Sequence, residues 1–217
     1  MAESISASLR DSMHNISTGL LIPVIIILML FMALVVVESG GLLAEALTER
    51  RRAKVNVPEL VNAFQGKNEQ EIMDVIADSR LFKRQKAALG ELTTNSNLPA
   101  DSLQALARRL LVSEELHYAK ITSRTDIVAR LGPMFGLMAT LIPLGPGLIA
   151  LGQGDTKTLA DSLLTAFDAT VSGLAAAGVA FVISKLRKRW YEDYLSSLEA
   201  LMESLLGVFA RERGIAE

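Results

Sequence analysis

Four polar side chains recur along one face of an apolar segment in the last third of the chain. In order they are Asp161, Thr165, Asp168 and Ser172. Spacings of four, three and four residues place them on one stripe of an α-helix. An ionised carboxylate near the middle of a membrane costs about 3 kcal/mol on insertion scales, so we expect Asp168 to face a bundle interior or water, or to be protonated. We therefore expect Asp168 to take part in ion passage. The alternative is that its carboxyl makes a structural hydrogen bond between subunits.

A second apolar segment, LGPMFGLMATLIPLGPGLIAL, combines small residues, prolines and a hydroxyl. Gly132 and Gly136 are four residues apart, a spacing that lets helices approach closely in lipid. Pro143 and Pro146 remove backbone hydrogen bonds, so we expect a kink or loosened turn beside Thr140. A hydroxyl beside a freed carbonyl fits a cation or water site, and a hydrogen bond from Thr140 back to its own helix is the alternative.

Small residues also lie opposite the polar stripe. They are Gly173, Ala176, Ala177 and Gly178. Residues of this size permit tight helix packing within a membrane. We therefore predict that Gly173 and Gly178 are packing positions.

Three stretches are long and apolar enough to hold these residues in a membrane. Residues 19–37 and 131–153 contain no charge, and residues 162–184 contain only that of Asp168. A helix of about 20 apolar residues spans the hydrocarbon core. We predict transmembrane helices over residues 18–38, 127–152 and 161–184. Because the preceding segment is partly acidic, we expect the first to be a retained anchor and not a cleaved signal peptide.

Lysine and arginine flank these spans on one side, which predicts the orientation of the chain. The basic flanks are Arg50, Arg51, Arg52 and Lys54, then Lys120, Arg124 and Arg130, then Lys185, Arg187, Lys188 and Arg189. Such flanks are cytoplasmic. We expect an all-α membrane protein with its N-terminus outside and its C-terminus inside. Residues 1–17 and 153–160 are then external, and residues 39–126 and 185–217 cytoplasmic.

The cytoplasmic residues are expected to be helical. Asn56 and Pro58 predict the start of a short helix and Gly66 its end. A second amphipathic piece carries Ile72, Met73, Ile76, Leu81 and Phe82, and residues 93–99 form a loop. No helix-breaking residue separates the helix after this loop from the second span. The amphipathic tail likewise follows the third span without a helix-breaking residue. We predict that both are continuous helices.

Composition excludes several functions. Half of the 217 residues are hydrophobic, there is no cysteine, and the net charge is −2. Disulfides and thiolate metal sites are therefore excluded, and a nucleic-acid partner is not expected. His14 and His117 lie far from the acidic stripe, and no nucleophile or phosphate motif occurs, so we do not expect an enzyme. No cofactor is expected beyond a transported H⁺ or Na⁺.

Together, GLMATLIPLGPGLIAL and LADSLLTAFDATVSGLAAAGVAFVIS resemble the paired-helix signature of the MotA/TolQ/ExbB proton channel family. That signature has Gly-Leu-x-Gly-Thr-Val in one span and Ala-Leu-x-x-Thr-x-x-Gly-Leu in the next. The matching residues are Gly136, Leu137 and Thr140 in the first motif, and Ala166, Thr170, Gly173 and Leu174 in the second. Ala139 stands where a glycine is usual. The resemblance covers residues 112–217, and three spans make it closer to ExbB and TolQ than to four-span MotA.

This resemblance implies a homo-oligomeric ring in the bacterial inner membrane, typically a pentamer, whose second and third spans line a pore. The pore would hold single-span partners of the ExbD, TolR or MotB type, whose essential aspartate couples ion flow to rotation. Thr165 stands where ExbB and TolQ carry a glutamate, so either Asp168, one turn further on, replaces that acid or the ring supplies only hydroxyls. The candidate ion-pathway residues are Thr140, Thr165, Asp168, Thr170 and Ser172. Their oxygens leave both H⁺ and Na⁺ open.

Two other classes of protein compete with this interpretation. A non-conducting, membrane-anchored helical scaffold would need no acid within the membrane, so Asp168 argues against it. In a small secondary transporter, Pro143 and Pro146 would mark a broken helix at a substrate site. No internal repeat supports that reading.

Overall fold

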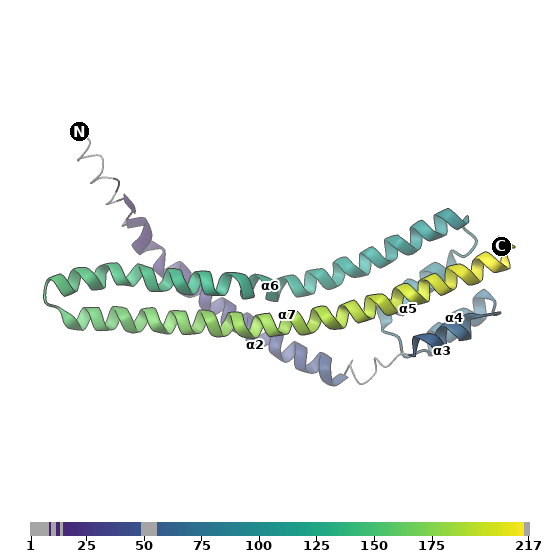
Figure 1. The fold of residues 1–217 in the computed structure, drawn as a ribbon, viewed down its shortest axis with the longest axis horizontal. Helices are drawn as coiled ribbons and strands as arrows, with labels where there is room; N and C mark the ends of the chain where they lie inside the picture. Colours follow the sequence, from purple (N-terminus) through teal and green to yellow (C-terminus); the bar gives the residue numbers. More distant parts are fainter. Residues whose placement is uncertain (1–8, 10–11, 14, 49–55, 215–217) are drawn as a thin grey trace. The chain divides into compact units, whose positions relative to one another are not determined.

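A computed structural model describes residues 9, 12–13, 15–48 and 56–214, which contain helices and no strand. The principal helices are α2 (Leu21–Thr48), α3 (Val57–Phe64), α4 (Glu69–Asp78), α5 (Lys83–Thr94), α6 (Ala100–Gly152) and α7 (Thr156–Glu212) (Figure 1). Among the described residues, three helical segments are long and apolar enough to cross a membrane: Asn15–Leu47, Ala100–Gly152 and Thr156–Glu212. The predicted all-α membrane fold with three spans is confirmed.

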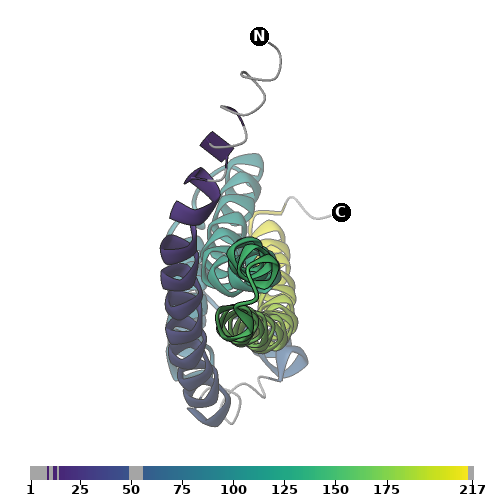
Figure 2. The same cartoon turned by 90° about the vertical axis from the view of Figure 1, so that its left-hand side faces the viewer.

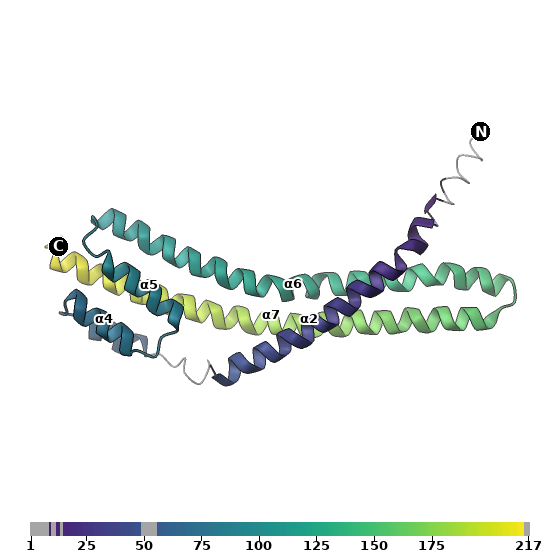
Figure 3. The same cartoon turned by 180° about the vertical axis from the view of Figure 1, so that it is seen from behind.

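The chain divides into two compact units, and α6 and α7 each continue from one into the other. The first unit contains residues up to 41 together with residues 123–185. In it, α6 and α7 run antiparallel, and α2 crosses this pair (Figures 1 and 3). Figure 2 looks along the pair from the end where the two helices are joined, with α2 on one side. Gly154 makes the joining turn with a φ of +80°, a conformation that glycine adopts without strain.

The second unit contains residues 42–122 and 186–217 and has an apolar core of its own. Its completely buried side chains include Phe64, Ile72, Leu89, Leu92, Leu201 and Leu205. They come from α3, α4, α5 and the last part of α7, and Leu103 adds the first turn of α6. The buried side chain of Gln85 donates a hydrogen bond to the carbonyl oxygen of Tyr194 at 3.1 Å, which ties α5 to α7.

Most local predictions for the second unit agree with the structure, and one segment differs. Helix α3 follows Asn56 with a proline in its first turn, and Gly66 beyond its end has a φ of +70°. The second amphipathic piece, in contrast, is not one helix. Helix α4 ends at Asp78, and Phe82 lies in the connection to α5, where its N–H group donates to the side chain of Gln85 at 3.2 Å.

Helices α6 and α7 are continuous, as predicted, but α7 begins five residues before the expected third span. Asp155 explains the early start, because Oδ1 of Asp155 accepts a hydrogen bond from the N–H group of Thr158 at 3.0 Å. The Thr158 hydroxyl also donates to Asp155, and these bonds lower the pKa of the Asp155 carboxyl. Helix α6 passes through Pro133, Pro143 and Pro146 without interruption.

One of the three groups of basic residues used to predict the orientation cannot be placed. Residues 50–52 and Lys54 lie outside the described residues. Helix α2 continues past the predicted end of the first span at residue 38 and ends at Thr48. The orientation of the chain therefore remains a prediction.

Candidate ion pathway

Glycine brings the backbones of α6 and α7 into direct contact. A Cβ atom added to Gly132 would lie 2.9 Å from the carbonyl oxygen of Gly173, and one added to Gly173 would lie 2.8 Å from that of Gly132. The second of these would also lie 3.1 Å from Cα of Gly136. No side chain fits at such distances, so this approach depends on glycine. Three of the four glycines predicted to pack are thus brought together, whereas Gly178 has no neighbour within 4 Å of its Cβ position.

Alanine continues this contact, and α2 covers one side of it. Buried alanines near the glycine contact are Ala139, Ala166, Ala176, Ala177 and Ala180. Val24 and Leu28 of α2 pack with Ala139, and Val35 packs with Val128, Ala176 and Ala180. The rings of Phe31 and Phe135 meet edge to face, with their centroids 5.8 Å apart. The two predicted pore-lining spans therefore form one closely packed pair.

The three candidate threonines all hydrogen-bond back to their own helices. The Thr140 hydroxyl donates to the carbonyl oxygen of Leu137 at 2.6 Å, which is the alternative considered above for this residue. Those of Thr165 and Thr170 donate to the carbonyl oxygens one turn earlier, at 2.9 and 3.0 Å. Each hydroxyl oxygen can still accept a hydrogen bond or bind a cation.

The candidate residues occupy two separate faces. Thr170 lies at the α6–α7 contact, because its Cα is 3.6 Å from the Cβ position of Gly136. Asp168 is two residues earlier, about 200° around the helix, and is exposed. Thr165 and Ser172 share the stripe of Asp168 by helical spacing. A single α7 helix therefore cannot present Asp168 and Thr170 to the same surface.

Asp168 is exposed on an apolar part of α7. Within the part of the chain that the structure describes, it has no ion pair or hydrogen-bond partner for its side chain. The large apolar side chains of Leu164, Phe167 and Val171 nearby are also exposed. A carboxyl group among lipid chains is unfavourable whether it is ionised or left without a hydrogen bond. The surroundings of Asp168 must therefore be completed by water, a second copy of the chain or a partner.

Two buried polar contacts were not predicted from the sequence. In the first unit, the Ser184 hydroxyl donates a hydrogen bond to Oδ1 of Asp126. In the second unit, Nε of Arg187 donates to Oε2 of Glu45 at 3.3 Å, and these side chains are only 6% and 13% exposed. Asp126 and Ser184 are the polar residues at the ends of two apolar runs, which is their only sequence signal. Spacing along one chain cannot pair residues that are 58 positions apart.

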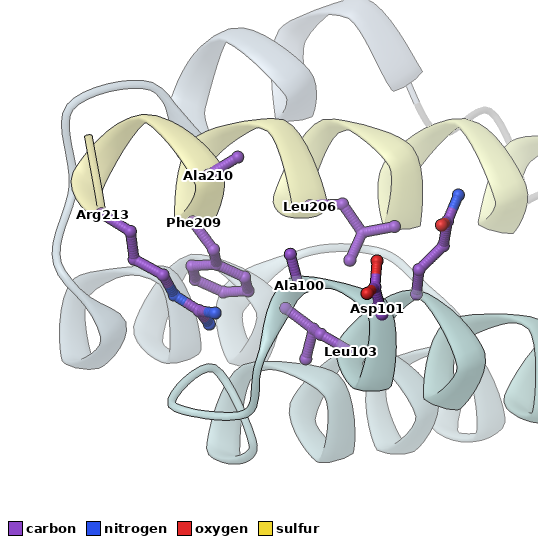
Figure 4. Close-up of a pocket in the computed structure, with 8 residues that line it drawn as sticks. Ala100, Asp101, Leu103, Leu206, Phe209, Ala210 and Arg213 are labelled. Atoms are coloured by element: carbon purple, nitrogen blue, oxygen red, sulfur yellow. The ribbon is translucent and has the colours of Figure 1, made fainter. Parts of the chain in front are cut away.

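A cavity in the second unit lies between the start of α6 and the end of α7 (Figure 4). Its walls include Leu103, Leu206 and Phe209, with Asp101 and Arg213 at its edges. Nη1 of Arg213 donates to the carbonyl oxygen of Leu98. Because this cavity lies outside the three apolar runs, it plays no part in the candidate ion pathway. Among the described residues, no group of three His, Asp or Glu side chains could hold a metal ion.

Comparison with known proteins agrees with the chemistry of the two long helices. The model of the MotA/TolQ/ExbB proton channel family matches residues 62–200, well over half of the chain. The matched region contains all of α4, α5 and α6 and most of α7, so both polar faces fall within it. A search of curated proteins gave no match. The predicted closeness to ExbB and TolQ within the family remains a prediction.

Proposed function

Since the chain belongs to the MotA/TolQ/ExbB proton channel family, we propose that it is the multi-span ring subunit of an ion-driven membrane motor. It conducts H⁺ or Na⁺ together with a single-span partner of the ExbD, TolR or MotB type and couples the flow to rotation or mechanical work. The close pair of α6 and α7 supports this function most directly, because it leaves the Asp168 carboxylate exposed and the Thr140 and Thr170 hydroxyls partly exposed.

The packing of α2 suggests which side of the pair faces the pore. Helix α2 covers the side formed by Ala139 and Ala169. Thr140 and Thr170 lie away from that side by helical spacing. We assign the side of these two hydroxyls to the pore and the side of α2 to lipid. Asp168 lies on a third side, so it meets either the neighbouring subunit or pore water.

A homo-oligomeric ring, a pentamer as is typical of the family, completes these surfaces. We place it in the inner membrane with the N-terminus outside and the C-terminus inside. Basic side chains support this orientation, since Lys120, Arg124 and Arg130 on α6 and Lys185 and Arg189 on α7 are all exposed. Cytoplasmic flanks are enriched in such residues.

The absence of cysteine from the sequence allows a direct test of the pore side. Thr140→Cys and Thr170→Cys, each in the complete complex, are expected to react with membrane-impermeant thiosulfonates, and the modification should reduce ion flux. Met29→Cys is the matched control, because Met29 is 69% exposed on the apolar α2 helix. We expect it to face lipid and stay unmodified. Reaction at position 29 with none at 140 and 170 would contradict the proposed pore side.

A further inference from the structure

The contact between α6 and α7 changes character at one end of the first unit. From Gly132 to Ala139 and from Ala166 to Ala180, its buried residues are glycine and alanine. Beyond this stretch of glycine and alanine, the contact contains Thr125 and Ser184, which are only 0% and 3% exposed. Asp126, next to Thr125, is half-buried. A buried polar group costs about 1–3 kcal/mol unless it is hydrogen-bonded, so the partners of this layer matter.

Asp126 and Ser184 form a pair that can carry a proton. The Ser184 hydroxyl donates to Oδ1 of Asp126 from the buried side. A hydroxyl both donates and accepts hydrogen bonds, and a carboxylate can take up a proton. The pair therefore has a buried end, at Ser184, and a partly exposed end, at Asp126. Asp126 is thus the member of the pair that water can reach.

Charged residues at this level come from all three helices of the unit. Arg124 and Arg130 on α6 and Lys185 on α7 are exposed, and Glu38 on α2 is half-buried. The pair therefore lies at the end of the first unit that carries charged side chains.

The pair is distant from the polar stripe of α7. Sixteen residues separate Asp168 from Ser184, a rise of about 24 Å along a helix, which approaches the thickness of the hydrocarbon core. From Gly173 to Ile183 no side chain carries a polar group. The pair is therefore a second polar site, at the other end of the membrane-spanning part of α7.

We propose that Asp126 is the group that releases protons on the cytoplasmic side of the ring. In each passage the Asp126 carboxylate accepts a proton from water in the pore and then gives it to cytoplasmic water, so that neither Asp126 nor Ser184 is changed. This inference rests on the proposed function and selects H⁺ as the transported ion. The alternative is that the hydrogen bond between Ser184 and Asp126 only holds α6 and α7 together, which requires no change in the protonation of Asp126.

Infrared titration of the full-length chain in lipid nanodiscs tests the change of protonation without a partner. Asp126→Asn keeps an acceptor for Ser184, so the fold should survive, and it should remove a titrating carboxyl band from the infrared spectrum. Ser184→Ala should shift the midpoint of that band. Glu115→Gln removes an exposed acid of α6 and is the control. An unchanged titration in Asp126→Asn would overturn the proposal.

Proton flux in vesicles that contain the complete complex tests the direction of release. Asp126→Asn should lower the flux about tenfold or more, as expected for loss of a proton-transfer group, and abolish its dependence on cytoplasmic pH. Asp126→Glu should restore both. Unchanged flux with unchanged dependence on cytoplasmic pH would overturn the inference. If the unmodified complex carried no flux, the proposed function would fail, while the infrared titration would still decide whether Asp126 titrates.

Discussion

At the scale of single residues, Asp168 is the charged candidate of the ion pathway, and it lacks a partner. It is exposed on an apolar helix and has no partner among the described residues. Thr140, Thr165 and Thr170, in contrast, satisfy their hydroxyl protons within their own helices. The carboxyl of Asp168 therefore depends most on what the assembly places beside it.

Replacing Asp168 with Asn separates its charge from its shape. The amide keeps the size and most of the hydrogen bonding but cannot titrate, so ring assembly should persist while ion-coupled work falls sharply. Thr170→Val removes one hydroxyl at nearly constant volume and should weaken transport less. Flux and native mass, measured on both variants, check this prediction.

Two results would assign Asp168 another role. If Asp168→Asn retained full activity while Thr140→Val abolished it, the hydroxyl face would be the conducting one. If Asp168→Asn dissociated the ring, a hydrogen bond between subunits would be its main contribution.

Sequence reasoning at this scale found isolated polar residues but not their partners. Asp168 is recognisable because a charge interrupts an apolar run. Helical spacing also relates Asp168 to Thr165 and Ser172. The contacts of Asp126 with Ser184 and of Glu45 with Arg187 join positions far apart in the chain, and they depend on which helix faces cross.

At the scale of elements, the α6–α7 pair depends on glycine at the point of closest approach. Gly173 and Gly178 offer a matched comparison, because both lie in α7 and each gains about 1 kcal/mol of helix propensity on replacement by Ala. Gly173→Ala would place a methyl group 2.8 Å from a backbone oxygen, whereas Gly178 has open space. Overpacking of this kind typically costs about 1–3 kcal/mol.

We therefore expect Gly173→Ala to lower the melting temperature of the reconstituted protein and Gly178→Ala to leave it unchanged or raise it. Thermal unfolding followed by circular dichroism measures both. Equal effects of the two changes would mean that α6 and α7 do not approach closely at Gly173. If Gly178→Ala lowered only the stability of the oligomer, Gly178 would pack against another subunit.

The sequence predicted long elements more accurately than short ones. Continuous apolar and amphipathic spacing predicted that α6 and α7 are long helices, because no helix-breaking residue interrupts either pattern. Helix α5 was not separated from α4, since Leu81 and Phe82 continue the apolar pattern although the backbone turns between the helices. The early start of α7 depends on the local bonds between Asp155 and Thr158, which hydropathy does not record.

At the scale of the whole molecule, exposed apolar side chains alone do not indicate an oligomer. Large apolar residues of all three spans are exposed, among them Met29, Leu141 and Val182. Lipid covers such residues as well as protein does, so they are compatible with a single copy. The exposed carboxyl of Asp168 is different, because lipid chains cannot supply its hydrogen bonds.

We therefore expect protein extracted in a mild detergent to be a closed homo-oligomer, with five copies as the stoichiometry typical of the family. Native mass spectrometry measures the copy number directly, and a dilution series separates a specific ring from association within micelles. A ring should keep one copy number down to low protein concentration, because its interfaces repeat and close on themselves. If only monomers were found at every concentration and in several detergents, the ring would be excluded, and the surroundings of Asp168 would have to be completed by water or a partner.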